Sequence, residues 1–248
     1  MASSSNDQTE YLIRGYAGRI SLLLALGWLV IMTGRSLLPP LLPIISLELS
    51  LTPDKAGFAL TVVWLAYSLA QYPGGRFSDQ LGKKTVLVVS LLLMLIGLIL
   101  LTQINSYYQF LAAGALMGVG AGGYFCPTRA LLSDLYTKKR GQAFGIQVAS
   151  GRTGSTIAAS IGTIALAYGV WREAFIPVII LFGIVIILLH IWSKEKYKFS
   201  RVTLDLSGTG ARVFRSRKLR WILLAYIFFA FTSQALASFL PTFLLTAR

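Results

Sequence analysis

The stretch Gly75-Arg76-Phe77-Ser78-Asp79-Gln80-Leu81-Gly82-Lys83-Lys84 is a short polar segment between two long apolar runs. We call residues 75–84 the hinge segment. It combines one carboxylate, three cations and two glycines. Gly75 is expected to let two helix backbones approach closely, and Gly82 permits a left-handed turn in a short loop. The pattern predicts a tight, charged connection between two helices.

The composition is that of a membrane protein. Of the 248 residues, 55% are hydrophobic and only 13% are charged, whereas soluble domains carry about 25% charged residues. The net charge of +14 could suggest nucleic-acid binding. The cations fall between the apolar runs, however, which favours a role in membrane topology. The lone Cys126 excludes an intramolecular disulfide.

About seven apolar runs are long enough to span a bilayer, which takes about 20 residues. A polar tail, residues 1–18, precedes them, and the first run is too long for a signal-peptide core. Three prolines in its second half predict a bend. The predicted spans are residues 19–47, 55–77, 85–102, 107–136, 141–169, 173–193 and 219–245.

The loops between these spans alternate in charge. Lys and Arg gather before the first span, in the hinge segment, after the fourth span and in a basic linker at residues 194–217. The positive-inside rule therefore places the amino terminus, the hinge segment and the linker in the cytoplasm, most simply at the cell membrane. The pattern Ser78-Asp79-x-x-x-Lys83-Lys84 recurs as Ser133-Asp134-x-x-x-Lys138-Lys139. A shared structural role and coincidence both remain open for this repeat.

The hinge segment resembles the loop signature of the major facilitator superfamily, G-x-x-x-D-x-x-G-[RK]-[RK], which lies between the second and third helices. Other matches cover nearly the whole chain: Pro43, Glu48, Arg140-Gly141-x-Ala143-x-Gly145, Trp171-Arg172-x-x-Phe175 and Leu240-Pro241-Thr242-Phe243. The resemblance implies an all-α membrane protein of a twelve-helix family built from two six-helix halves around a central site. We expect a six-helix half at residues 19–193, the linker, and at 218–248 the first helix of an incomplete second half.

The same resemblance implies a conformational latch. In the family, the matching aspartate and cations make and break contact with the opposite half as the transporter changes state. Asp79 can pair with cations or cap a helix, and Lys83 and Lys84 are expected to hold the loop at the anionic membrane surface. The latch residues are Gly75, Asp79, Gly82, Lys83 and Lys84.

Small residues recur every four positions on the fourth and fifth spans, a spacing that places them on one helix face for close packing. They are Gly114, Gly118 and Gly122, and Gly154, Ala158 and Gly162. The second set resembles the antiporter signature of the family. Ala158 and Ala159 replace its Gly-Pro pair, and Thr163 its last glycine, so drug/proton antiport is a weaker alternative and generic packing is favoured.

Two arginines lie inside predicted spans, Arg35 in the first and Arg152 in the fifth. Each costs about 2.5–3.5 kcal/mol to insert, so such residues usually face a cavity and bind something. The alternative is an arginine that snorkels to the surface. With the polar stripe of the second span and a threonine beside Arg152, the candidate cavity residues are Arg35, Arg152, Trp64, Tyr67, Gln71 and Thr156.

Every carboxylate lies in a loop or at a span end, so none can neutralise these arginines. A small organic anion would supply the missing charge. Arg35, eight residues before Pro43, is similar in placement to an arginine of organic-anion members, although the arginine those members carry on the seventh helix is missing from residues 221–247. The expected partners are the bilayer, an anionic solute, a coupling proton or counter-anion and the missing second half, with no nucleic acid.

The family resemblance and the two arginines together predict a secondary transporter of a small organic anion that works by alternating access. Other classes of protein are alternatives to it. A truncated or split-gene fragment without transport of its own fits a chain that stops after the seventh span. A retinal or signalling receptor fits the helix count but lacks a lysine inside the last span. An enzyme is not expected, because the spans hold no catalytic constellation and no ligand set for a metal or cofactor.

Overall fold

The computed structural model describes residues 12, 14–194, 215–229 and 232. The chain divides into two units, Met1–Val202 and Thr203–Arg248. Every regular element in the described residues is helical. In the second unit, residues 217–229 form a helix whose side chains are exposed within the structure. This helix begins the predicted seventh span. The rest of that span, the motif at 240–243 and most of the basic linker lie outside the described residues.

The first predicted span is two helices, α1 (Gly15–Ser36) and α2 (Leu38–Glu48), joined at Leu37. Leu37 still donates its backbone N–H to the Thr33 carbonyl at 3.1 Å. Prolines occupy the first turn of α2, and another lies inside it. Because proline lacks the N–H that continues a helical ladder, the helix is interrupted here. The long first span is confirmed as one stretch of 34 residues, Gly15–Glu48, and the break between its two helices lies next to the prolines. The bend stays a prediction.

Five further helices complete the bundle, and their bounds lie within a few residues of the predicted spans. They are α3 (Pro53–Leu81), α4 (Lys83–Thr102), α5 (Tyr107–Leu135), α6 (Arg140–Tyr168) and α7 (Ile176–Trp192), the last preceded by a short 3-10 turn, η1 (Glu173–Phe175). The main difference lies in the hinge segment. Most of it continues α3, and Gly82 alone separates α3 from α4. The predicted loop is thus a single-residue break between two helices.

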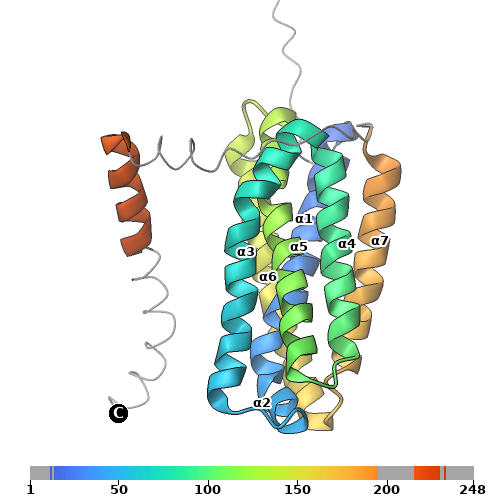
Figure 1. Ribbon diagram of the computed structural model, residues 1–248. Helices are drawn as coiled ribbons and strands as arrows, with labels where there is room; N and C mark the ends of the chain where they lie inside the picture. The colour runs from blue at the N-terminus through green and yellow to red at the C-terminus, as the bar shows by residue number, and fades with distance from the viewer. Residues whose placement is uncertain (1–11, 13, 195–214, 230–231, 233–248) are drawn as a thin grey trace, which may run out of the picture. The chain divides into compact units, whose positions relative to one another are not determined.

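The helices pack as an extended bundle (Figure 1). The main contacts pair α5 with both α3 and α4, and α1 with α6, while α7 packs against α1 and α4. Large apolar side chains fill the spaces between these helices. Those that are essentially inaccessible include Leu24, Ile31, Leu87, Leu91, Met94, Phe110 and Phe182.

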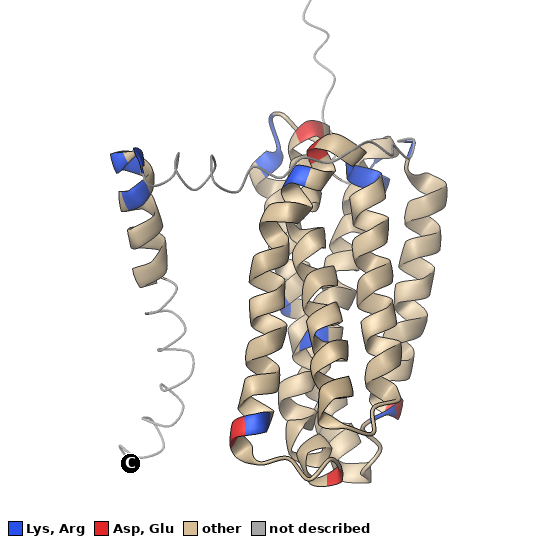
Figure 2. Ribbon diagram, in the orientation of Figure 1, with Lys and Arg blue, Asp and Glu red and all other residues tan. Residues whose placement is uncertain are grey.

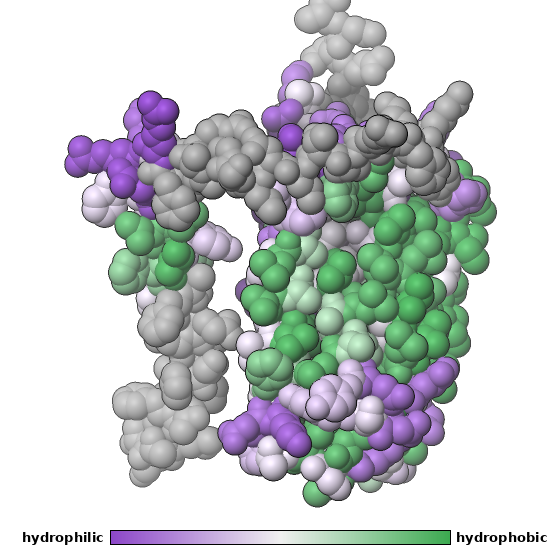
Figure 3. All heavy atoms as spheres, in the orientation of Figure 1, coloured by the Kyte–Doolittle hydropathy of each residue, from purple (hydrophilic) through white to green (hydrophobic). Residues whose placement is uncertain are grey.

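Charged residues concentrate at the two ends of the bundle (Figure 2). We call the end that carries the hinge segment, the α5–α6 connection and the end of α7 the basic end; it is uppermost in Figures 1 to 3. An apolar band lies between the polar ends on the face seen in Figure 3. Among the described residues, four spans are long and apolar enough to cross a membrane: Gly15–Glu48, Lys83–Thr102, Tyr107–Leu135 and Glu173–Trp192.

Helices α3 and α6 have 29 residues each, and so have the length of a span. They lie outside that set of four because polar side chains lower their hydropathy. These two helices carry most of the predicted cavity residues. Polar side chains in a span usually face a cavity rather than lipid, so the polarity of α3 and α6 is as expected for helices that carry cavity residues.

Candidate functional site

Arg35 is clasped by two aromatic rings from another helix. It lies near the end of α1, and its guanidinium carbon is 4.2 Å from the centre of the Trp64 ring and 4.7 Å from that of Tyr67. Both rings belong to α3, one helical turn apart, and they meet edge to face at 6.0 Å. A cation held against aromatic faces gains about 0.5–2 kcal/mol, depending on how far it is desolvated. The structure thus brings together three residues that the sequence placed on two separate helices.

The guanidinium of Arg35 has N–H donors that are not used in strong hydrogen bonds. Its Nη2 donates to the Met32 sulfur at 3.6 Å, a weak acceptor. Its Nη1 is buried and has no hydrogen-bond partner among the described residues. The described carboxylates all lie toward the bundle ends, where Asp134 pairs with Lys83 and Glu48 with Arg172. The aromatic faces stabilise the positive charge of Arg35 without neutralising it, which is the electrostatic condition for binding an anion.

Gln71 follows Tyr67 by one turn on the same face of α3 and is half-buried. It therefore continues the polar stripe toward the basic end. The described structure gives it no contact with Arg35.

Arg152 and Thr156 lie on an exposed face of α6. The Thr156 hydroxyl donates to the Arg152 carbonyl at 3.1 Å, a bond within the helix. The opposite face of α6 meets α1, where Thr33 donates to the Gly154 carbonyl and the Ser36 and Ser155 hydroxyls share a bond, each at 3.1 Å. Ser155 therefore contacts the residue next to Arg35. Arg152 points away from this helix contact, and the described structure shows no contact between the two arginines.

The glycines of α5 determine how closely α3 approaches. A Cβ on Gly118 would meet the Val63 carbonyl and stand 3.0 Å from the Tyr67 nitrogen, and one on Gly122 would meet the Tyr67 carbonyl. Gly114 lies against the Val63 side chain in the same way. The Gly118 and Gly122 contacts include the backbone of Tyr67 itself. The small-residue stripe therefore sets the position of the aromatic clasp around Arg35.

The second stripe lies between α6 and the first span. A Cβ on Gly154 would meet the Leu29 carbonyl, and one on Gly162 would stand 2.8 Å from the Pro40 ring. Ala158, between them, is completely buried. The stripe holds α6 close to α1 and α2.

The hinge residues divide into three environments. Gly82 adopts φ +83°, a conformation that favours glycine. Asp79 is exposed, while Lys83 forms an ion pair with Asp134 at the end of α5. This pair joins a cation from one copy of the Ser-Asp-x-x-x-Lys-Lys repeat to the carboxylate of the other.

Two expectations for the hinge segment need correction. The Lys84 side chain is buried and so is not exposed to the membrane surface: it is only 6% exposed, and its Nζ donates to the His190 and Ser193 carbonyls, both at 2.9 Å. A cation at the carboxyl end of α7 is favourable because the last carbonyls lack partners in the helix. The close backbone approach falls at Gly74, whose Cβ would stand 2.9 Å from the Gly123 Cα, whereas Gly75 has ordinary contact with Cys126.

Two polar features escaped the sequence reasoning. At the end opposite the basic end, Glu48 pairs with Arg172 at 2.6 Å and accepts the Trp171 indole N–H at 2.7 Å. Arg172 also donates to the Thr102 and Ile104 carbonyls, so it ties α4 to η1. The motif residues were visible in the sequence, but their pairing was not. Gln147 gave no signal at all, yet it is 2% exposed and neither amide atom has a partner among the described residues.

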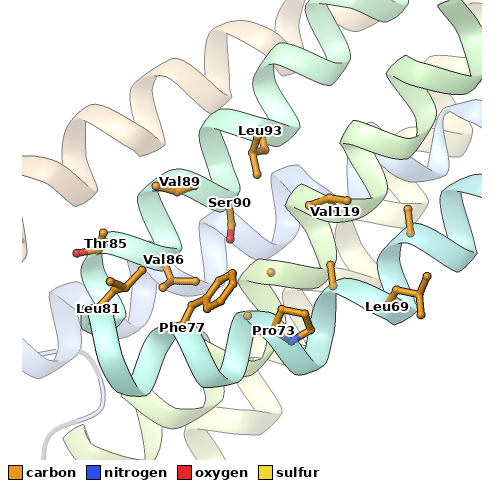
Figure 4. Close-up of a pocket in the computed structure, with 14 residues that line it drawn as sticks. Leu69, Pro73, Phe77, Leu81, Thr85, Val86, Val89, Ser90, Leu93 and Val119 are labelled. Atoms are coloured by element: carbon orange, nitrogen blue, oxygen red, sulfur yellow. The ribbon is translucent and has the colours of Figure 1, made fainter. Parts of the chain in front are cut away.

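An apolar cavity of about 500 Å³ lies apart from Arg35 (Figure 4). It opens between α3 and α4, with α5 behind it, and Thr85 and Ser90 supply its only hydroxyls. A lining without charged side chains is unsuited to an anion. The lining residues are Ala66, Leu69, Ala70, Pro73, Gly74, Phe77, Leu81, Thr85, Val86, Val89, Ser90, Leu93, Val119 and Gly123.

Comparison with known proteins agrees with this architecture. The model of the Major Facilitator Superfamily matches residues 24–248. A probable sulfoacetate transporter of Cupriavidus necator is 30% identical over 179 residues, covering 71% of this chain and 42% of the relative. A probable 4-methylmuconolactone transporter of Cupriavidus pinatubonensis is 25% identical over 210 residues, 81% of this chain and 48% of the relative.

A multidrug resistance protein of Proteus mirabilis is 30% identical over 202 residues, covering 79% of this chain and 49% of the relative. Among solved structures, a bacterial homologue of the human lysosomal transporter Spinster, inward-facing and unoccupied, matches with a TM-score of 0.70. It is 20% identical, and the match covers 94% of this chain and 56% of that one. The chain thus spans about half the length of the curated relatives it matches.

Proposed function

The chain belongs to the major facilitator superfamily, and on that basis we propose that it acts in secondary transport of a small organic anion by alternating access. It is a multi-pass membrane protein of a family of transporters, not of enzymes. The anionic substrate is inferred from the site. We propose Arg35 as the principal anion-binding residue, with Arg152 and Thr156 on the cavity face of α6.

The observation that carries the proposal is the environment of Arg35. Its charge is stabilised by the Trp64 and Tyr67 rings, its Nη1 is buried without a partner, and no described carboxylate neutralises it. A carboxylate or sulfonate that reached this guanidinium would gain charge-assisted hydrogen bonds in a poorly hydrated place. The name of one relative, a sulfoacetate transporter, is in keeping with an anionic solute.

Several further roles belong to the same proposal. The basic end faces the cytoplasm at the cell membrane, as the excess of Lys and Arg there favours. The exposed Asp79 and the Lys83–Asp134 pair form one side of a latch toward a second six-helix half. That half, in the same polypeptide or a separate one, supplies the rest of the cavity and residues for coupling to a proton or counter-anion.

Uptake into proteoliposomes tests the substrate class, with radiolabelled sulfoacetate as the probe and the full reading frame as the protein. Arg35→Gln should lower probe affinity at least about tenfold, because a hydrogen bond to a charged group is worth about 1.5–3 kcal/mol. Arg152→Gln should also reduce uptake. Arg129→Gln is the matched control, since Arg129 also lies over an aromatic ring, that of Phe125 at 4.4 Å. Wild-type uptake by both cavity variants would exclude an anion site at these arginines.

Drug/proton antiport is the second candidate, favoured by the multidrug resistance relative. The same vesicles can be loaded with ethidium and given a pH gradient. Gradient-driven ethidium movement with no sulfoacetate uptake would replace the anion proposal with antiport. Residues 1–248 alone, compared with the full reading frame, test the fragment alternative, which predicts transport only when a second half is present.

A further inference from the structure

A cationic pocket lies at the basic end, away from the Arg35 site. It has a volume of about 340 Å³ and opens where the start of α1 meets the end of α7. Its lining residues are Gly15, Tyr16, Arg19, Trp192 and Lys194. The pocket therefore joins the first and last helices of the six-helix unit.

The lining combines positive charge with aromatic surface. Arg19 and Lys194 are both exposed, and the ammonium of Lys194 lies 5.1 Å from the centre of the Tyr16 ring. The backbone N–H of Lys194 donates to the Tyr16 hydroxyl at 3.1 Å, which fixes the lysine beside the ring. No lining residue is acidic; Glu195, next in the chain, lies outside the described residues. Two cations that share an accessible pocket favour an anion between them.

The pocket is held in place by a buried contact. Lys84 of α4 donates to the His190 and Ser193 carbonyls, both at 2.9 Å, and so fixes the last turn of α7. Trp192 lies between these two carbonyls in sequence, and Lys194 follows them. Because α7 ends at an anchored position, the cation and the indole are presented at a defined place and not on a loose chain end.

The position along the helices suits a membrane interface. Tyr16 is the second residue of α1 and Trp192 the last of α7, and aromatic residues at span ends lie at the level of the lipid headgroups. Arg19, a turn further into the span, can extend its guanidinium to the same level. If the basic end faces the cytoplasm, as in the function proposed above, the adjacent leaflet is the one rich in anionic phospholipid.

We propose that this pocket binds the phosphodiester headgroup of an anionic phospholipid, with Arg19 and Lys194 holding the phosphate and Trp192 at the glycerol level. The bound lipid then links α1 to α7 by an interaction that a zwitterionic lipid supplies less well. Binding can be measured without transport, so failure of this proposal leaves the solute proposal untouched, and the reverse also holds.

Native mass spectrometry of the purified chain in neutral maltoside micelles tests the proposal. Dioleoyl phosphatidylglycerol and dioleoyl phosphatidylcholine are titrated in parallel, and the dissociation constant of the first bound lipid is compared. Wild type should prefer phosphatidylglycerol. Arg19→Gln with Lys194→Gln should weaken phosphatidylglycerol binding about 25-fold, about fivefold for each cation removed. Phosphatidylcholine binding should fall much less, because its choline already offsets the charge of the phosphate.

Two variants serve as controls. Lys138→Gln with Lys139→Gln removes the same charge from another connection at the basic end, and should change the affinity less than about twofold. Arg19→Lys with Lys194→Arg keeps the charge and should bind like wild type. Circular dichroism and the melting temperature establish that each variant is folded before binding is compared.

Equal loss in the Lys138/Lys139 variant would overturn the proposal, because attraction would then depend on net charge and not on the pocket. Unchanged binding by the Arg19/Lys194 variant would overturn it as well. Inorganic phosphate distinguishes the two sources of a phosphate group. If inorganic phosphate at the lipid's concentration displaces phosphatidylglycerol, the pocket is a site for free phosphate and the lipid proposal is wrong.

Discussion

Gly118→Ala measures how tightly α3 is held against α5, and therefore how firmly the clasp around Arg35 is positioned. The new methyl group would stand 2.8 Å from the Ala66 Cβ and 3.0 Å from the Tyr67 nitrogen, and would also meet the Val63 carbonyl. Two of these three neighbours are backbone atoms, so no side-chain rotation relieves the overlap. Overpacking of this kind costs about 1–3 kcal/mol.

A matched control isolates the packing cost. Glycine to alanine also raises helix propensity by about 0.8–1 kcal/mol, whatever the surroundings. Gly145 lies inside α6, and a Cβ there would meet nothing within 4 Å. Gly145→Ala therefore has the propensity gain without the overlap. The difference between the two variants should be about 1–3 kcal/mol, with Gly118→Ala the less stable.

The assay is the free energy of unfolding in mixed micelles titrated with sodium dodecyl sulfate. Anion binding by the same samples gives a second measurement, because a displaced Tyr67 weakens the clasp around Arg35. Gly118→Ala should lose affinity for the probe anion, and Gly145→Ala should keep it. Equal stability of the two variants would refute the close approach of α3 and α5, and with it the account of how the clasp is held.

Three further predictions concern single contacts. Lys84→Met should destabilise the bundle by about 2–3 kcal/mol in the same titration, because two carbonyls lose a charged donor. Lys83→Met breaks an ion pair with a partly exposed partner and should cost less than about 1 kcal/mol. Equal losses in the two variants would contradict the burial of Lys84. Trp64→Leu should lower the unfolding free energy by about 0.5–1 kcal/mol, as expected for one cation–π contact. It should also weaken anion binding, because Arg35 is held less firmly, and a binding isotherm identical to wild type would show that the ring is dispensable. Glu48→Gln should lower the unfolding free energy by about 1 kcal/mol, since Arg172 keeps its two carbonyl acceptors but loses its ion pair; a loss fully suppressed by 1 M salt would assign the effect to charge alone.

The helices and the clasp were predictable to different degrees. Span bounds follow from the lengths of the apolar runs, and the helix break after α1 follows from the prolines of α2, because both properties are local. Arg35, Trp64 and Tyr67 could each be assigned to a polar helix face from a periodicity of 3.6. That all three meet depends on α5, whose glycines bring α3 close, and no local pattern states which helix a glycine stripe faces.

Adjacent residues in and beside the hinge segment have different tertiary contacts that the local sequence does not predict. Lys83 and Lys84 have the same chemistry and adjacent positions, yet one pairs with α5 and the other is buried beneath α7. Gly74 and Gly75 differ in the same way, since only Gly74 faces the α5 backbone. Adjacent residues on a helix point about 100° apart, so they face different neighbours. Which neighbour each one faces depends on how the helix is rotated in the packed bundle. The burial of Gln147 could not be predicted from the sequence, because a glutamine on a helix rich in small residues is normally expected to lie on a polar surface.

The buried Lys84 also has a consequence for biosynthesis. Its acceptors, the His190 and Ser193 carbonyls, lie 106 and 109 residues further along the chain. Synthesis proceeds from the amino terminus at about 5–20 residues per second, so the ammonium leaves the ribosome several seconds before either acceptor exists. During that interval neither of these hydrogen bonds can form, and they are completed only when α7 arrives. Burial of this lysine therefore marks the moment at which the nascent six-helix unit is complete.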